Sequence, residues 1–175
     1  MSDEPRSPDH QANIMNVFWN IIELLDRSAI GFEFIPHIPE GRTDVASIVR
    51  RHELSEAAKS MLIEVRYSKK NEDKRYVLVV VPGNKRVDFK AVAMLMDGRN
   101  AQLATEGSVH SMMHCVPGAV PPFSFNSSVP VIADSSLLAS SRMIFNAGRL
   151  DRSIAIKTKH YFDAFYFQCG LVSMQ

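Results

Sequence analysis

The sequence predicts a mixed α/β (α+β) single domain, in which a central mixed β-sheet, or partly open barrel, is flanked by helices. Two observations lead to this class. Apolar residues recur at three- and four-residue spacing in some segments, as in helices, and in alternating or continuous runs in others, as in strands. Helical and extended segments are interspersed without a strict βαβ repeat. No internal repeat or linker divides the chain, so we expect a leader over residues 1–10 and one domain over residues 11–175.

The N-terminal quarter is expected to hold a long helix, a strand and a short helix. The leader is rich in Pro, Ser and acidic residues, which favours disorder. Apolar residues between positions 14 and 25 share one helical face. The segment GFEFIPHI, residues 31–38, alternates and then meets prolines, as a strand running into a loop does. Thr43 is expected to cap a short helix over residues 44–50.

Two strand-like runs predict a hairpin at the centre of the sheet. Residues 59–68 and 75–83 are rich in apolar and β-branched residues, and the polar stretch between them is typical of a turn. The second run is apolar on both faces, which indicates a central strand. A helix should follow, with Asp88 as its N-cap and Gly98 as its end.

The C-terminal half is expected to hold two helices and three strands. Thr105 should cap a helix that ends near residue 114, and Thr158 a last helix that ends near Phe165. The strands are predicted at residues 129–133, 142–148 and 153–158. The tail after residue 161 is rich in aromatic residues, so it either docks on the domain or forms a homodimer contact.

The overall composition excludes several function classes. A formal net charge of +1 gives no general attraction to nucleic acid, so DNA is not an expected partner. Two cysteines far apart, without a CxxC motif, are typical of a reducing compartment. The polar first residues do not resemble a signal peptide, and no apolar run reaches the roughly 20 residues of a membrane span. We therefore expect a cytoplasmic protein without a membrane partner.

The most unusual segment is HCVPGAVPPFSF, residues 114–125. Prolines on both sides of one glycine exclude a helix interior and restrict the backbone. Gly118 can adopt a positive φ and lets another group approach closely. The N–H groups of Gly118, Ala119 and Val120 could then converge on a carboxylate or a developing oxyanion. The alternative is a rigid turn whose phenylalanines fill the core.

An ordered set of motifs resembles the YbaK family, the free-standing relatives of the editing domain inserted in bacterial prolyl-tRNA synthetases. In chain order, between residues 37 and 161, the motifs are AAKSMLIEV, VLVVVPGNKRVDFKAVA, a glycine and a proline four residues apart in PGAVPP, VPVIAD, FNAG and SIAIKT. The segments PGAVPPFSF and FNAGRLDRSIAIKT are most similar to the YeaK-like branch. The resemblance implies an editing-domain fold that uses no metal or other cofactor.

The resemblance also implies a trans-editing aminoacyl-tRNA deacylase, which hydrolyses the ester between a wrong amino acid and the terminal adenosine of tRNA. A synthetase pocket rejects a slightly smaller amino acid by only about 1–3 kcal/mol, so a second sieve is needed. In the family, loop amides, a lysine and the substrate's own 2′-hydroxyl do this work. The YeaK-like branch makes Ser, Thr or Ala the expected amino acid. The alternative is a non-catalytic module that binds an amino acid, aminoacyl-tRNA or a synthetase through the same pocket.

From the resemblance, the catalytic candidates are Lys59, Gly118, Ala119 and Pro122. Lys59 would bring positive charge to the ester or to the acceptor end, unless it is a solvated residue at a strand end. Gly118 would exclude a side chain that blocks approach to the backbone. Ala119 would contribute its N–H and help to limit the size of the pocket.

The candidates for substrate binding are His37, Val120, Pro121, Asp134, Asn146, Gly148 and Ser153. His37 either borders the amino-acid pocket, acts on a water, or is structural. Asp134 either orients the ligand's α-amino group or caps a helix. Asn146 and Gly148 are expected to hold a tight turn beside the site, with Asn146 available for a polar contact with the substrate.

The sequence offers little sign of a metal site or of a side-chain nucleophile. His110 and His114 have a spacing that can bind metal, yet no third ligand is evident near them. There is no GxSxG motif, and neither cysteine has a histidine–acid context. The expected partner is the single-stranded acceptor end of misacylated tRNA, bound weakly by stacking and by local basic pairs such as Arg50/Arg51. A synthetase or elongation factor could assist this binding.

Overall fold

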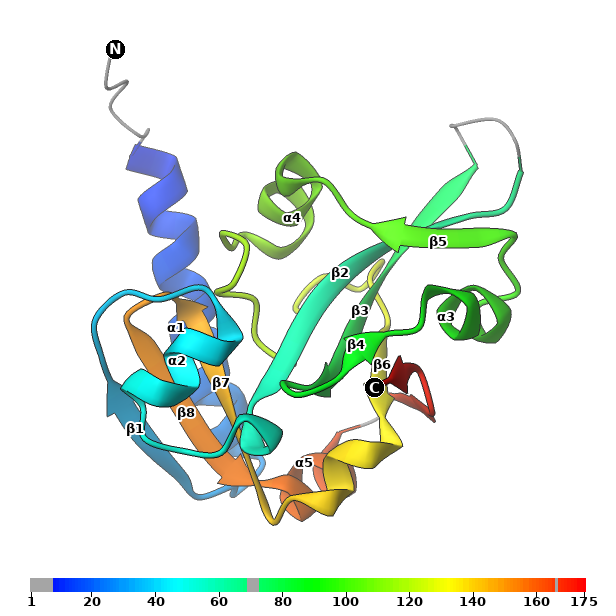
Figure 1. Cartoon of the computed structure of the whole chain (residues 1–175). Helices are drawn as coiled ribbons and strands as arrows, with labels where there is room; N and C mark the ends of the chain where they lie inside the picture. Colours follow the sequence, from blue (N-terminus) through cyan, green and yellow to red (C-terminus); the bar gives the residue numbers. More distant parts are fainter. Residues whose placement is uncertain (1–7, 69–72, 166) are drawn as a thin grey trace.

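The computed structural model describes residues 8–68, 73–165 and 167–175, and for residues 8–16 it describes the helical backbone alone (Figure 1). A disordered leader is expected over residues 1–10, and residues 1–7 of it lie outside the described residues. Residues 8–10 are already helical, so the expected leader is too long at its C-terminal end.

The domain contains five α-helices and ten strands in its described part. The helices are α1 (Pro8–Arg27), α2 (Thr43–Val49), α3 (Phe89–Leu95), α4 (Glu106–Met113) and α5 (Thr158–Ala164), with 3₁₀ turns η1 (Leu54–Glu56) and η2 (Ser135–Ala139). The strands are β1 (Phe32–Pro36), β2 (Ala58–Arg66), β3 (Lys74–Pro82), β4 (Arg86–Val87), β5 (Asn100–Leu103), β6 (Val131–Asp134), β7 (Arg142–Arg149), β8 (Arg152–Lys157), β9 (Gln168–Gly170) and β10 (Ser173–Met174).

The strands form a mixed five-stranded sheet, an antiparallel three-stranded sheet and a short pair. The largest sheet has the order β5-β2-β3-β6-β9, with β3 antiparallel to β2 and parallel to β6. The smaller sheet has the order β1-β8-β7, and β4 pairs with β10. The predicted hairpin and central strand are confirmed, and no closed barrel is present in the described part of the chain.

The two main sheets share one large hydrophobic core, and a second core lies under α3. One face of β2 and β3 packs toward α1, β7 and β8, whereas the other face packs on Val92 of α3. In Figure 1, α1 and the three-stranded sheet form one half of the molecule, and the five-stranded sheet with α3 and α4 forms the other. The site described below lies where these halves meet.

Several predicted helix ends are confirmed and two are shifted. Asp88 and Thr105 accept hydrogen bonds from backbone N–H groups as N-caps of α3 and α4. Thr43 and Thr158 are the first residues of their helices and do not cap them. No helix in the described ranges has the length and hydropathy needed to span a membrane.

The aromatic tail docks on its own domain. Tyr161 is fully buried, and the rings of Phe162, Phe165 and Phe167 lie within 6 Å of its ring, centre to centre. Beyond them, β9 and β10 pair with β6 and β4. The first of the two expectations for the tail is therefore confirmed by the intramolecular packing.

Candidate active site

A small cavity of about 40 Å³ lies between α2, the start of β2, β7 and the proline-rich loop. Its wall includes polar and backbone groups from all four segments, namely Thr43, Arg50, Lys59, Ser60, Gly118 and Asn146. Ala46, Ala58, Val120 and Phe145 supply the apolar part. The sequence therefore brings Lys59, Gly118, Val120 and Asn146 together as expected, although they are spread over almost 90 residues.

The conformation of the proline-rich loop depends on a glycine in a left-handed conformation. Gly118 has a φ of +86°, and a Cβ atom there would lie 2.6 Å from the carbonyl oxygen of Gly41. The group that approaches this backbone closely is thus another part of the protein. Gly148, at a φ of +74° beside a bulge in β7, donates its N–H to the carbonyl of Ala119. These main-chain contacts fix the loop before any ligand binds.

Two of the three amides expected to face a ligand have no acceptor among the described residues. The N–H of Ala119 donates to the carbonyl of Val116 at 3.0 Å, so the expectation that it serves a ligand is wrong. The N–H groups of Gly118 and Val120 have no acceptor among the described residues. Both Gly118 and Val120 border the cavity.

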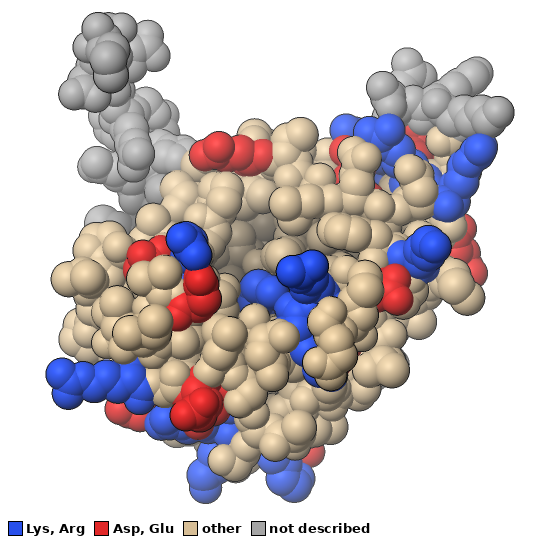
Figure 2. Space-filling model, viewed as in Figure 1, with Lys and Arg blue, Asp and Glu red and all other residues tan. Residues whose placement is uncertain are grey.

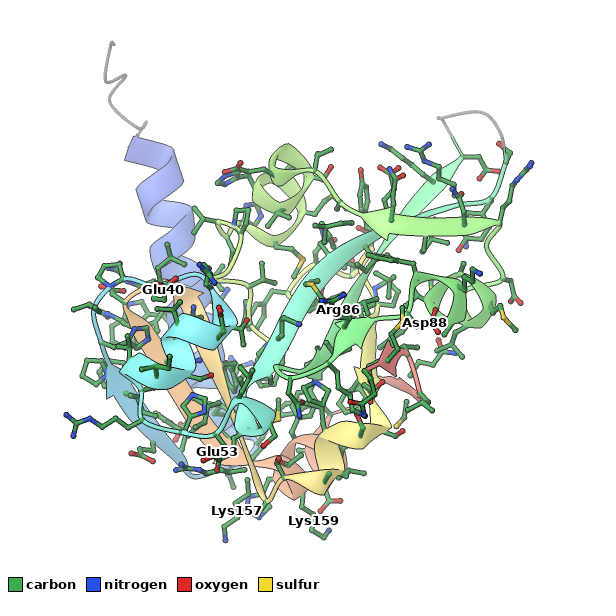
Figure 3. The ribbon with its side chains drawn as sticks, in the orientation of Figure 1. Glu40, Glu53, Arg86, Asp88, Lys157 and Lys159 are labelled. Atoms are coloured by element: carbon green, nitrogen blue, oxygen red, sulfur yellow. The ribbon has the colours of Figure 1, made fainter. Side chains whose placement is uncertain are left out.

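Lys59 contributes a half-buried ammonium group. Its Nζ donates to the carbonyl of Lys85 at 2.6 Å, which uses one of its three N–H donors. Burial lowers the pKa of Lys59, and the positive charge of Arg86 lowers that pKa further. In the view of Figure 2, basic side chains gather near the centre of the visible face of the molecule, beside a hollow. Figure 3 labels Arg86 of β4 in that region.

A chain of hydrogen bonds connects Arg50 and Asn146 of the cavity wall to Ser153 and His37. Arg50 donates through Nη1 to the Ser153 hydroxyl at 2.8 Å and to Asn146 Oδ1 at 3.2 Å. Ser153 also contacts Asn146 Oδ1 at 2.9 Å and His37 Nε2 at 2.8 Å. Because the Ile38 carbonyl accepts from His37 Nδ1, the imidazole is held by both ring nitrogens. His37 and Ser153 are not part of the cavity wall, and Ser153 contacts two residues that are, Arg50 and Asn146.

Asn146 has no hydrogen-bonding capacity left for a substrate. Its Nδ2 donates to the carbonyls of Gly118 at 2.8 Å and Glu40 at 3.0 Å, while Oδ1 accepts from Arg50 and Ser153. An amide has two donors and two acceptor sites, so it is saturated. The expected polar contact with substrate is replaced by a clamp that ties the proline-rich loop to the segment before α2.

Arg50 borders the cavity, although the sequence suggested it only as half of one basic pair, Arg50/Arg51, for tRNA binding. No carboxylate lies within ion-pair distance of it in the described part of the chain, and burial lowers the pKa of its guanidinium to about 10. Its neighbour Arg51 is exposed and has a φ of +56°, beyond the end of α2. The sequence shows two adjacent arginines, and only the helix end determines which of them turns inward.

The comparisons with known proteins agree with this geometry. A family model for the aminoacyl-tRNA editing domain matches residues 43–164, well over half of the chain. The chain belongs to the aminoacyl-tRNA editing domain family. The predicted resemblance, the fold class and the expected editing hydrolase are thereby confirmed.

Relatives of this editing domain are known from sequence and from crystal structures. The chain is 32% identical over 142 residues to the multifunctional Ser/Thr-tRNA deacylase ProXp-y of Escherichia coli K12, which covers 81% of this chain and 83% of that protein. The fold matches the hypothetical protein APE2540, with a TM-score of 0.78, 18% identity, and 88% and 99% of the two chains covered. It also matches a provisionally assigned trans-editing enzyme for prolyl tRNA synthetase, with a TM-score of 0.74, 18% identity, and 98% and 100% covered.

Besides His37, Ser153, Ala119 and Gly148, three more expected site residues of this editing domain are not part of the cavity wall. Pro122 is buried, and its carbonyl accepts from the Tyr161 hydroxyl at 2.8 Å, so it anchors the loop to the core. Pro121 borders a different, larger cavity on the far side of the loop. Asp134 is fully buried and accepts from the N–H groups of Ser136 and Val172, so the capping interpretation is confirmed and substrate binding is wrong.

The described residues of the editing domain hold no cluster suited to a metal ion. No group of three His, Cys, Asp or Glu side chains converges in the described ranges. His110 instead lies 3.5 Å from Glu106, one turn earlier on α4.

Proposed function

We propose that this editing domain hydrolyses serine or threonine esters of tRNA at the cavity beside Gly118. The observation that carries the proposal is that one small cavity is bordered by two cationic side chains, Lys59 and Arg50, and by two loop residues whose N–H groups have no acceptor among the described residues. Amide donors and fixed cations stabilise the oxyanion that forms when water attacks an ester. The name of the Escherichia coli relative supports serine and threonine as the amino acids removed.

Water is the proposed nucleophile. Its oxygen attacks the ester carbonyl carbon, the bond from that carbon to the ribose oxygen breaks, and the ribose oxygen takes up a proton. Free amino acid and tRNA leave. An aminoacyl ester is an activated substrate, so positioning of the water and stabilisation of the oxyanion supply most of the required acceleration.

The substrate must help to activate the water. No Asp, Glu, His or Cys side chain is part of the described wall of the cavity, so no ordinary general base is close to the ester. A neighbouring ribose hydroxyl is the nearest group able to relay a proton. This role of the substrate agrees with the 2′-hydroxyl mechanism that the family resemblance implies.

The size of the cavity limits the amino acid. A space of about 40 Å³ holds only a few water-sized groups, because one water needs about 10–15 Å³. A hydroxymethyl or hydroxyethyl side chain fits such a space, whereas a long or aromatic side chain does not. The acceptor end of tRNA is then expected to lie across the basic centre of the face in Figure 2.

The test is to measure release of amino acid from tRNA charged with Ser, Thr, Ala, Cys or Pro. We expect the wild-type protein to release Ser and Thr fastest. In the Gly118→Ala variant the new Cβ would clash with the Gly41 carbonyl, so kcat/KM should fall about 100-fold or more through loss of the oriented amides.

Gly107→Ala is the matched control, because a Cβ atom at Gly107 of α4 meets no atom within 4 Å. We expect this variant to keep wild-type activity, and Lys59→Ala to lose it. Binding of charged tRNA without release of any amino acid would reject the proposal and favour a non-catalytic binding module.

A further inference from the structure

The mechanism above does not use the hydroxyl of Ser60, a residue of the cavity wall. Ser60 follows Lys59 in β2, and strand alternation places it on the core-facing side with Ala58 and Leu62. Its Oγ is buried and has no hydrogen-bond partner among the described residues. Buried hydroxyls are nearly always paired, so a partner from a ligand is the natural explanation.

Arg50 offers a second unused group in the same cavity. Its Nε donates to the Ala46 carbonyl and its Nη1 to Asn146 and Ser153, which leaves both hydrogens of Nη2 without an acceptor in the described part of the protein. Arg50 and Ser60 both border the cavity. A guanidinium donates only, whereas a hydroxyl donates and accepts, so together they match a ligand hydroxyl.

The rest of the wall makes this pair selective. The carbon atoms of Ala46, Ala58, Val120 and Phe145 bound the space, and the side-chain amide of Asn146 is saturated within the protein. Apart from Thr43, and from Lys59 and the loop amides that the proposed mechanism uses for the ester, Ser60 and Arg50 are the polar partners that the wall offers, and an apolar side chain would leave both unpaired. A site built to hydrogen-bond a hydroxyl discriminates against the analogue that lacks it.

We propose that Ser60 and Arg50 bind the side-chain hydroxyl of the esterified amino acid and so select serine and threonine over alanine. The hydroxyl oxygen accepts from Arg50 Nη2, and its proton is donated to Ser60 Oγ. This inference rests on the proposed function, since it requires the cavity to hold the amino-acid side chain. It assigns a specificity-determining role to two residues that were not among the predicted site residues.

The decisive measurement is the ratio of kcat/KM for one tRNA charged with serine to that for the same tRNA charged with alanine. In Ser60→Ala we expect this ratio to fall about tenfold, the usual effect of losing one hydrogen bond. Ser47→Ala is the matched control, because its buried hydroxyl already donates to the Thr43 carbonyl in α2. We expect Ser47→Ala to keep the wild-type ratio.

Binding of stable analogues separates this inference from the proposed function. The probes are 3′-amino-3′-deoxyadenosine carrying serine or alanine through an amide, measured by calorimetry. Wild-type protein should prefer the seryl analogue, and Ser60→Ala should lose that preference. If the wild type hydrolyses no ester but shows this preference, the proposed function fails and the inference stands.

An unchanged serine-to-alanine ratio in Ser60→Ala, in hydrolysis and in analogue binding, would overturn the inference. An equal loss on both substrates, accompanied by a lower melting temperature, would also overturn it, because Ser60 would then be structural.

Discussion

Glu64 and Arg50 both carry a charge on a side chain that is largely buried. The hydrogen-bond partners of Glu64 include side chains of opposite charge, whereas those of Arg50 do not. Glu64 is 3% exposed, and its carboxylate accepts from Arg66 at 2.8 Å, Lys74 at 3.0 Å and Gln102 at 3.2 Å. Arg50 donates only to neutral oxygens, and no carboxylate pairs with it in the described ranges.

The difference agrees with a structural role for the Glu64 cluster and with the proposed ligand-binding role of Arg50. The partners of Glu64 lie on β2, β3 and β5, so the closed cluster joins three neighbouring strands. Burying a cation without a counter-charge is unfavourable, and such a group persists where a ligand or a reaction uses it.

Arg50→Met should abolish most activity and leave stability nearly intact. The change removes donors beside the ester and loosens the clamp on Asn146, so we expect kcat/KM for seryl-tRNA to fall about 100-fold. Replacing an unpaired buried charge by an apolar side chain of similar length is often neutral for stability. Single-turnover deacylation and a thermal melt measure the two effects. A large drop in melting temperature with full activity in the folded fraction would show that Arg50 stabilises the fold and does not serve the reaction.

Asn146→Asp would give Arg50 the carboxylate that it lacks and so make its cluster resemble that of Glu64. The carboxylate cannot donate to the Gly118 and Glu40 carbonyls, so the loop should lose its clamp and kcat should fall about tenfold or more. Asn126→Asp is the matched control, because Asn126 Nδ2 also donates to a carbonyl, that of Met112, outside the candidate active site. Equal activity of the two variants would show that the clamp does not position the loop.

Where local signals suffice, the sequence predicted the structure. The hairpin of β2 and β3 follows from its apolar runs, and the caps at Asp88 and Thr105 follow from residue type. The short strands β4, β5, β9 and β10 were missed, since each exists through pairing with a partner distant in sequence.

The site was predictable for some of its members and not for its connections. Lys59, Gly118, Val120 and Asn146 meet at one cavity, as expected from their motifs. The contact of His37 with Ser153 spans 116 positions, and no local pattern encodes it. A serine on the core-facing side of β2 is the one signal in the strand pattern that could have identified Ser60.

Glu64→Gln should lower stability without changing activity. Arg66 and Lys74 are about one-third exposed and can be hydrated after the change, so the expected loss is about 1–3 kcal/mol in the free energy of unfolding. Urea denaturation measures this loss, and deacylation of seryl-tRNA by the folded protein should equal that of the wild type. A loss of activity at unchanged stability would place Glu64 in the functional cluster.

The smallest predicted effect is a pH dependence of the free energy of unfolding that arises from the ionisation of Glu64. Burial alone would raise the pKa of Glu64, but hydrogen bonds from Arg66 and Lys74 more than offset it and hold the pKa below its ordinary value of 4.5. A carboxyl whose pKa is lower in the folded state stabilises the fold above the unfolded pKa, and this contribution disappears as pH falls through the folded pKa. The stability difference between wild type and Glu64→Gln should therefore shrink as the pH is lowered from about 6 to about 3. Urea titrations of both proteins across this range measure the change, and a difference that grows toward low pH would mean that the folded state raises the pKa of Glu64.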